Sequence, residues 1–388
     1  MTTVTEAAAE DTGRAGPERF SPLWHVAIIL ALYVLLRGLQ SAAIGWLAQP
    51  GATVADSLLS WDAGWFVTVA GEGYPTNYSY DQDGVLVGNG IAFFPLYPAL
   101  IRLTSFTGLS LPDAALVVTW VCGAAAALAL FQLGTRLYDR RTGYALTVLV
   151  IAQPMSVVLN MGYSEGLFLA LASGALLAAH KRAWIPMGVL GLAGALTRPT
   201  GFALTVALGV AALLAWRTST TRERITSLTA AGVAMAGTPA YLLWAGHRIG
   251  DWDAWFRIQT AGWGSTFDFG RTTLAFLDGT MRTGNSWVQV SVAWILIGAV
   301  VLAFVAVLHR PWWPLVAYGL VTLVLVVGQG GYYHSKPRLL VPVLLVLLPL
   351  ATALGRARWR TIVPALAGYA AFGLWYGAYL VTVWPYTI

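Results

Sequence analysis

Carboxylates just outside apolar segments are the residues of this sequence best suited to acid–base chemistry. Asp62 lies between Trp61 and Trp65, shortly after the first long apolar segment ends. A carboxylate that is partly removed from water between two tryptophans can act as a general base. The same residue can instead cap a short helix at a membrane interface, with the tryptophans anchored among lipid head groups. The residues alone leave both roles of Asp62 open.

Glu165 is the second acidic candidate. It follows Tyr163 and Ser164, immediately before another apolar segment. In the first turn of a helix its charge would complement the helix dipole, so a capping role competes with a role in binding or catalysis. Glu72, within the run Gly71–Tyr74, is the third acidic residue that we consider for a site.

The run Ala92–Pro98 reads A-F-F-P-L-Y-P and is followed by Arg102. This pattern favours the proline-bounded start of an amphipathic helix whose aromatic residues, Tyr97 among them, lie among lipid head groups. Taken alone, the residues of this run therefore favour a structural role over a functional one.

Basic side chains that could hold a phosphate gather in one loop. His334, Lys336 and Arg338 supply three candidate donors within five residues, directly before an apolar segment. Arginine suits this role best because its planar guanidinium binds a phosphate through two parallel hydrogen bonds. The alternative is that Lys336 and Arg338 reach toward lipid head groups from a buried position. Arg198, in the run T-R-P-T-G between two apolar segments, is open to the same two interpretations. The other basic residues without a topological role are Arg37, Arg102, Arg248, Arg257, Arg271 and Arg282.

The elements that position these residues belong to a membrane protein. Of the 388 residues, 57% are hydrophobic and 10% are charged, whereas soluble domains carry about a quarter of charged residues. This composition excludes a water-soluble fold, a coiled coil and a disulfide scaffold. The 18 tryptophans are typical of the aromatic belts at membrane interfaces. The single cysteine, Cys122, lies within an apolar segment and behaves as a small hydrophobic residue.

Eleven apolar segments are predicted to span the membrane in an all-α, polytopic fold. They are residues 23–46, 113–135, 144–160, 164–180, 184–197, 200–216, 226–246, 287–308, 312–328, 339–354 and 361–384. Residues 1–20 are polar and are predicted to be a disordered cytoplasmic tail, followed by a single membrane domain over residues 21–388. Residues 47–112 and 247–286 form two long loops, which in a compact bundle are usually functional.

The distribution of charge predicts how the chain crosses the membrane. With the N-terminus in the cytoplasm, most basic residues fall in short cytoplasmic loops, as the positive-inside rule requires. Between Arg37 and Arg102 the sequence contains five acidic residues and no Lys or Arg. Both long loops are therefore predicted to face the extracytoplasmic side. Residues 91–106 are apolar enough to span the membrane, but a span there would reverse every later loop. We interpret them as a helix that lies at the outer interface.

The net charge of +6 does not indicate a nucleic-acid partner, because the basic residues form no stripe along any element. The composition instead predicts membrane lipids as partners. The histidines are not spaced as metal ligands. The run Asp81–Gly84 resembles the start of a calcium loop, but Ala92 occupies the position where that loop needs a glutamate. A divalent metal is compatible with the candidate residues and is not required by them.

Taken together, the motifs resemble those of the PIG-V-like integral-membrane mannosyltransferases, a family of the GT-C glycosyltransferase superfamily. The matching runs are W-D-A-G-W-F, G-Y, A-F-F-P-L-Y-P, Y-S-E and R-P-T-G, in the family's order from Trp61 to Gly201. Beyond Gly201 the chain matches mainly as alternating spans and loops. Ala63 departs from the glycine that many relatives carry after the aspartate. The excess of arginine over lysine points to a bacterial member of actinobacterial type.

The resemblance implies a GT-C-type bundle of about 11 transmembrane helices with juxtamembrane helices in the first long loop. It also implies inverting transfer of mannose from a polyprenyl- or dolichyl-phosphate-mannose donor to a lipid or glycolipid acceptor, on the extracytoplasmic face of the plasma membrane. Asp62 is the expected base. The expected ligands of the donor phosphate are His334, Lys336, Arg338 and Arg198, and the expected sugar or acceptor contacts are Trp61, Trp65, Glu72, Tyr97 and Glu165. A transporter or flippase of a lipid-linked sugar, and a non-catalytic partner in glycan assembly, are the alternatives.

Overall fold

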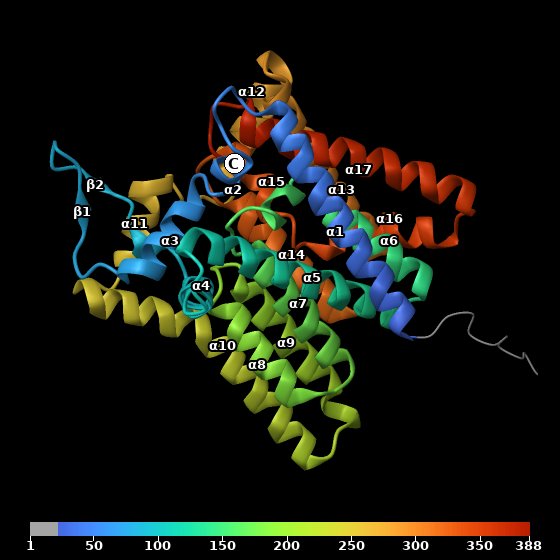
Figure 1. Cartoon of the computed structure of the whole chain (residues 1–388). Coiled ribbons are helices and arrows are strands. Elements are labelled where there is room, and N and C mark those ends of the chain that lie inside the picture. The colour runs from blue at the N-terminus through green and yellow to red at the C-terminus, as the bar shows by residue number, and fades with distance from the viewer. Residues whose placement is uncertain (1–21) are drawn as a thin grey trace, which may run out of the picture.

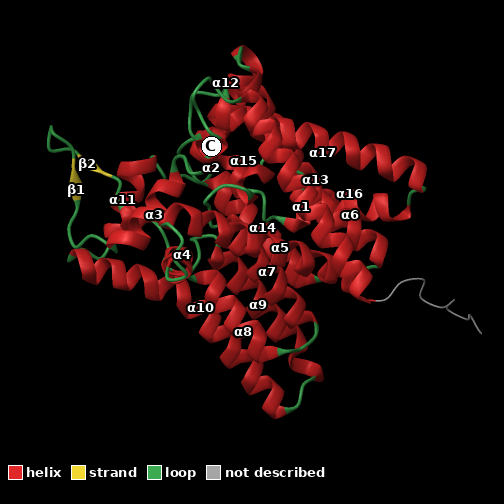
Figure 2. Cartoon of the chain, viewed as in Figure 1, coloured by secondary structure: helices red, strands yellow, loops and turns green. Residues whose placement is uncertain are grey.

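The structure, a computed structural model, describes residues 22–388, so the predicted tail at residues 1–20 lies outside the described residues. Within this part of the chain there are 17 α-helices, four short 3-10 helices and one two-stranded antiparallel hairpin (Figure 2). The fold is mostly helical, as the apolar segments predict.

The elements follow one another along the chain in the order shown in Figure 1. The first half contains α1 (Pro22–Leu47), α2 (Val54–Leu58), α3 (Asp62–Glu72), β1 (Ser79–Tyr80), β2 (Leu86–Val87), η1 (Gly90–Ala92), α4 (Leu96–Ser105), α5 (Leu111–Leu137), α6 (Arg140–Ile151), η2 (Ser156–Leu159), α7 (Glu165–His180) and α8 (Trp184–Ala195). The second half contains α9 (Gly201–Ala215), η3 (Trp216–Thr218), α10 (Thr221–Ile249), α11 (Ala254–Trp263), α12 (Arg271–Thr283), α13 (Trp287–Leu308), α14 (Trp313–Gly328), η4 (Tyr333–Ser335), α15 (Lys336–Leu339), α16 (Leu344–Arg356) and α17 (Trp359–Thr382).

Each of the eleven predicted spans coincides with a helix or with a pair of consecutive helices. Among the described residues, five helices are long and apolar enough to cross a membrane: Leu23–Leu47, Leu111–Leu137, Gly201–Thr218, Thr221–Ile249 and Trp287–Leu308. A sixth span results if the bent pair Tyr333–Leu339 and Leu344–Arg356 counts as one. Helices α7, α8 and α14 are apolar but shorter. The count of eleven spans therefore stays a prediction.

Polar residues at the helix ends fix where the elements start. Thr220 and Glu223 form a capping box at the start of α10, and Gly250 ends that helix in the left-handed conformation. Ser110 caps α5 by accepting a hydrogen bond from the backbone nitrogen of Asp113. These caps satisfy backbone groups that the helices themselves leave unpaired.

Small residues let the helices of the bundle approach closely. A Cβ atom at Gly188 of α8 would lie 2.9 Å from the Cβ of Ala230 in α10. A Cβ atom at Gly134 of α5 would lie 2.8 Å from the Cα of Gly143 in α6. Such contacts are typical of membrane helices, whose association depends on close packing rather than on the hydrophobic effect. Helices α8, α9 and α10 form one branch of the bundle, while α1 and α17 lie on another side (Figure 1).

The two long loops are folded and pack against each other. The first contains α2, α3, the hairpin, η1 and α4, and the second contains α11 and α12. Helix α11 contacts both η1 and β2, at a point where the backbones of Gly88 and Gly262 meet. Figure 1 shows α3, α4, α11 and the hairpin gathered at one side of the molecule. The predicted helix at residues 91–106 is present as η1 and α4, and it is shorter than a span.

Candidate functional site

Asp62 is the first residue of α3, and its carboxylate is directed to a cation. The preceding residue, Trp61, is the N-cap and has a φ of 54°, a left-handed conformation that is strained for a bulky residue. The backbone nitrogen of Asp62 donates to the hydroxyl of Tyr163 at 3.3 Å. The Oδ2 atom lies 2.7 Å from Nη1 of Arg338. Trp61 rather than Asp62 is thus the N-cap of α3, and the carboxylate of Asp62 forms an ion pair, a contact that differs from both roles left open by the sequence.

Four charged side chains from distant parts of the chain form one continuous network. Arg338 joins two carboxylates, because its Nε also lies 3.7 Å from Oε1 of Glu165. The same oxygen of Glu165 lies 3.0 Å from Nη1 of Arg198. The side chains of Glu165 and Arg198 are 3% and 9% exposed, so water screens their interaction little. The order Asp62, Arg338, Glu165, Arg198 alternates negative and positive charges.

The N-terminal ends of two helices position Glu165 and Arg198, the more buried pair of this network. Glu165 is the first residue of α7, and Arg198 lies in the short link between α8 and α9. Rings cover both guanidinium groups, since Arg198 lies 5.7 Å from the ring centroid of Phe168 and Arg338 lies 5.1 Å from that of Tyr163. The dipole of α7 favours an acidic residue at the position of Glu165, so the predicted capping role and the ionic role are compatible.

A cavity of about 190 Å³ opens onto the network. Its charged lining consists of Asp62, Glu165, Arg198, Lys336 and Arg338. Its aromatic lining consists of Phe66, Phe93, Phe94, Trp255, Trp263 and Tyr332. Both long loops contribute to the cavity, together with the starts of α7 and α9 and the segment before α16. The structure thus brings five of the predicted site residues to one place.

The aromatic wall of the cavity is held by hydrogen bonds to its backbone. The hydroxyl of Tyr241, in α10, donates to the carbonyl oxygens of Ile91 and Phe93 at 2.9 and 2.8 Å. The amide of Gln259, in α11, donates to the carbonyl of Ala92 at 3.1 Å. The ring of Phe93 lies 5.3 Å from that of Trp263. The A-F-F-P run therefore builds the wall of a cavity, a role that the residues alone did not reveal.

The predicted phosphate cluster at residues 334–338 divides into three separate environments. Arg338 joins the network. Lys336 lines the cavity, but its ammonium group donates to the carbonyl of Val326 at 2.9 Å and to that of Gln329, where it completes the end of α14. His334 is buried outside the cavity lining, with its ring 5.3 Å from that of Tyr332. The spacing of the three residues suggested a joint site that the backbone does not form.

The remaining predicted contact residues lie outside the cavity lining. Glu72 is exposed at the end of α3. Tyr97 is fully buried and donates to the carbonyl of Ala115 at 3.1 Å, so its predicted place among lipid head groups is wrong. Trp65 stacks behind the wall against Phe93, with ring centroids 6.1 Å apart. Trp61 packs against the core of the bundle.

Other arginines that the sequence left without a topological role bind elsewhere. Arg37 is buried in α1 and donates to the carbonyl of Ser156 at 2.6 Å and to that of Ile151. Arg248 donates to the carbonyls of Tyr74 and Pro75. These arginines hold backbone segments in place and lie outside the cavity lining.

Several donors in the network keep hydrogen-bonding capacity. Nε and Nη1 of both Arg198 and Arg338, and the hydroxyl of Thr200, have no aligned hydrogen-bond partner among residues 22–388. The arginine contacts are thus ion pairs without well-aligned hydrogen bonds, and an anion in the cavity would satisfy such donors. Within the same residues, no group of three or more His, Cys, Asp or Glu side chains is placed to hold a metal ion.

Thr200, Gln259 and Tyr241 belong to the site but did not stand out in the sequence. Thr200 belongs to the R-P-T-G run, so that motif contained the signal for it. The length of the loop at residues 247–286 was the signal for Gln259. Tyr241 lies inside an apolar helix, and only the packing of α10 against the wall identifies it.

No family model and no curated protein sequence matches this chain. Among solved structures, it resembles ArnT from Cupriavidus metallidurans bound to undecaprenyl phosphate, with 15% identity and a TM-score of 0.55 over 90% of this chain and 64% of that one. The apo state of the same protein gives 14% identity and a TM-score of 0.53 over 89% and 62% of the two chains. The chain thus spans less than two thirds of the length of these structures. At this level of identity the comparison shows a shared fold: this chain has the fold of ArnT over most of its length.

Proposed function

We propose that this protein is an inverting glycosyltransferase that moves mannose from a polyprenyl-phosphate-mannose donor to a lipid or glycolipid acceptor, on the extracytoplasmic face of the plasma membrane. The observation that carries the proposal is the convergence of Asp62, Arg338, Glu165 and Arg198 on one cavity between the two long loops. A carboxylate beside paired guanidinium groups combines a base with ligands for a phosphate.

The reaction needs both kinds of group. The acceptor hydroxyl attacks the anomeric carbon, a new carbon–oxygen bond forms, and the bond from that carbon to the phosphate oxygen breaks. The hydroxyl proton passes to the carboxylate of Asp62, and polyprenyl phosphate leaves with an additional negative charge. Arg338 and Arg198 stabilise that charge as it develops. Attack from the face opposite the phosphate inverts the configuration of the sugar.

The fold supports the lipid-phosphate part of the proposal. A solved structure with the same fold, ArnT, binds undecaprenyl phosphate. The cavity of this chain offers buried guanidinium donors without aligned partners among residues 22–388, which suits the same chemical group. The choice of mannose rests on the resemblance of the motifs to the PIG-V-like family. The aromatic residues Phe93, Trp255 and Trp263 supply the surface on which a sugar ring packs.

The direct test is an assay of the purified protein in liposomes with radiolabelled polyprenyl-phosphate mannose and a lipid acceptor extract. We expect labelled glycolipid and released polyprenyl phosphate from the wild type, and a loss of at least about a hundredfold in rate for Asp62→Asn, the lower range for loss of a general base. Asp83→Asn is the matched control, because Asp83 is exposed in the hairpin loop, away from the cavity lining.

The possible outcomes separate the alternatives. Transbilayer movement of the intact donor without product would identify a flippase. Transfer that appears only when a second protein is added would identify a partner in glycan assembly. Full activity of Asp62→Asn would reject Asp62 as the base while leaving the enzyme class intact.

A further inference from the structure

Two residues with different expected tasks bind each other in this structure. Asp62 is the proposed base, and Arg338 is a proposed ligand of the donor phosphate. Their charged atoms lie 2.7 Å apart, and their side chains are 18% and 12% exposed. A carboxylate neutralised by a guanidinium group is a weaker base, because the ion pair stabilises its charged form. A guanidinium group that is paired with a carboxylate likewise binds a phosphate less strongly.

The two arginines of the network differ in how firmly they are fixed. Among residues 22–388, Arg198 forms an ion pair with Glu165 alone, at 3.0 Å. Its backbone is held by the start of α9, where the nitrogen of Gly201 donates to the carbonyl of Arg198 at 2.9 Å. Arg338 is shared between Asp62 and Glu165, with the shorter distance to Asp62. Arg198 therefore has one fixed partner, whereas Arg338 has a choice of partners.

Arg338 also lies on the least regular part of the bundle. Helix α15 has four residues, and it meets α16 at an angle of 59° across a short break. Gly331 precedes this segment with a φ of 101°, and Pro342 follows it. Short elements between such breaks can shift without unfolding a long helix. A small displacement of α15 moves the guanidinium group of Arg338 relative to Asp62.

The charges of the network favour a change of partners when an anion enters. Asp62 and Glu165 balance Arg198 and Arg338, so these four groups have no net charge. A phosphodiester adds one negative charge to a poorly hydrated space, where an unpaired charge is costly. Lys336 is already held by two backbone carbonyls. The donor phosphate therefore binds most favourably when one of the two carboxylates gives up its guanidinium group.

We propose that Arg338 exchanges partners, from Asp62 in the empty site to the donor phosphate in the loaded site, and that this exchange releases Asp62 to act as the base. The inference rests on the proposed function and adds a regulation of that same site. Glu165 keeps Arg198 in place throughout. Without donor, Asp62 remains paired and does not activate an acceptor hydroxyl, so donor binding precedes acceptor activation.

The test is a double-mutant cycle on the binding of undecaprenyl phosphate, the lipid phosphate without a sugar. The protein is held in lipid nanodiscs, and the dissociation constant is measured by microscale thermophoresis for the wild type, Asp62→Asn, Arg338→Gln and the double variant. If Asp62 competes for Arg338, Asp62→Asn binds the lipid about tenfold more tightly than the wild type, the effect of one additional charge-assisted hydrogen bond from Arg338 to the phosphate. In the Arg338→Gln background the same change gives no gain, because the contested group is absent.

The cycle distinguishes partner exchange from simple repulsion between Asp62 and phosphate. Repulsion predicts the same gain with or without Arg338, and that result would overturn the inference. An unchanged dissociation constant for Asp62→Asn, or a wild type that does not bind undecaprenyl phosphate, would overturn it as well. Asp251→Asn and Arg257→Gln form the control cycle, because this pair has the same 2.7 Å distance but lies outside the cavity lining.

Failure of the inference and failure of the proposed function have different signatures. A positive cycle in a protein that transfers no sugar would retain partner exchange and reject the transferase. Normal sugar transfer without coupling between Asp62 and Arg338 would retain the transferase and reject partner exchange. Thermal unfolding of each variant without lipid checks that the fold is intact.

Discussion

Glu165 holds two arginines with a single carboxylate oxygen. Its Oε1 lies 3.0 Å from Arg198 and 3.7 Å from Arg338, and its side chain is 3% exposed. Removing the negative charge would leave two buried cations with one carboxylate between them. Such a change is costly, because a buried charge that loses its partner is neither hydrated nor neutralised. Glu165 is thus the residue of this network whose charge contributes most to the stability of the fold.

We therefore expect Glu165→Gln to lower the free energy of unfolding by about 3 kcal/mol, within the range for broken buried ion pairs. Undecaprenyl phosphate should recover more stability in this variant than in the wild type, because the phosphate replaces the missing anion. Thermal unfolding in detergent, with and without the lipid, measures both effects. Glu72→Gln is the control, since Glu72 is exposed at the end of α3. An unfolding temperature that does not change would contradict the buried role of Glu165.

The charged residues of the site were predictable from the sequence, but the ion pairs between them were not. Asp62, Glu165, Arg198 and Arg338 stood out because ionisable residues near apolar segments are rare and expensive. Which carboxylate meets which guanidinium group depends on how the starts of α3, α7 and α9 converge with α15. From the sequence we expected Glu165 to contact the sugar or the acceptor and Arg338 to bind the phosphate. The contact between these two residues was therefore not predicted.

At the scale of elements, helix α11 forms one side of the cavity and packs against β2. The Cα atoms of Gly88 and Gly262 approach so closely that a Cβ on Gly262 would lie 2.7 Å from the Cα of Gly88. The next residue, Trp263, lines the cavity. The position of the aromatic wall thus depends on the absence of a side chain at Gly262.

Gly262→Ala should displace α11 and reduce sugar transfer, although alanine normally stabilises a helix by about 1 kcal/mol relative to glycine. Overpacking of this kind costs about 1 to 3 kcal/mol. Hydrogen exchange should increase in residues 254–263 and in the wall at residues 90–94. Gly279→Ala in α12 is the matched control, since a Cβ there meets nothing within 4 Å among the described residues. Equal behaviour of the two variants would refute the proposed contact.

The hairpin is fastened to the second long loop by an ionic contact. Tyr78 donates to Asp251 at 2.7 Å, and Arg257 lies 2.7 Å from the same carboxylate oxygen. The hydrogen bond from Tyr78, with further hydrogen bonds from Asp253 and the positive charge of Arg257, lowers the pKa of Asp251 to about 2. Because this pKa lies below the unfolded value of about 4, the contact stabilises the loop above pH 4 and is lost as the pH falls through 2.

Pepsin provides the measurement, because it remains active in this pH range. Cleavage of the wild type near Tyr80 and Leu86 should increase as the pH falls from about 4 to about 2, over the interval between the two pKa values. Asp251→Asn should be cleaved rapidly already at pH 4. Cleavage sites within the membrane helices serve as the internal control. A hairpin whose cleavage does not depend on residue 251 would show that another contact holds it.

Helices were predictable from long apolar segments of the sequence, whereas the breaks within these helices were not. Residues 287–308 were predicted as a span and form α13 with the same ends. The predicted span at residues 339–354 instead begins with the short α15 and a bend near Pro342 before α16 starts at Leu344. The predicted span at residues 144–160 ends early as a helix at Ile151, shortly before Pro154. Proline removes a helical hydrogen bond, but its effect on a particular helix depends on tertiary contacts.

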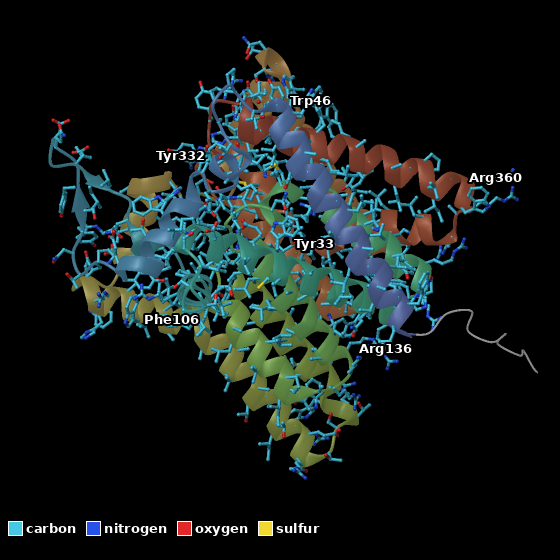
Figure 3. All side chains as sticks on the ribbon, viewed as in Figure 1. Tyr33, Trp46, Phe106, Arg136, Tyr332 and Arg360 are labelled. Carbon is cyan, nitrogen blue, oxygen red and sulfur yellow. The ribbon has the colours of Figure 1, made fainter. Side chains whose placement is uncertain are left out.

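At the scale of the whole molecule, α7 and α9 each begin near the cavity and end near basic residues. Helix α7 runs from Glu165 to His180, next to Lys181, and α9 runs from Gly201 near Arg198 to the turn that contains Arg217. The cavity and these basic residues therefore lie at opposite ends of the same helices. Figure 3 shows the same separation for Tyr332, which lines the cavity, and Arg136.

This arrangement, with the positive-inside rule, predicts that the cavity opens on the extracytoplasmic side. The single cysteine makes a direct test simple, because Cys122→Ala provides a background without thiols. In this background, Asp83→Cys in the hairpin loop and Arg217→Cys after α9 each place a thiol at an exposed position. A membrane-impermeant maleimide added to intact cells should label Asp83→Cys at once and Arg217→Cys only after permeabilisation. Labelling of Arg217→Cys in intact cells would reverse the orientation and move the proposed sugar transfer to the cytoplasmic face.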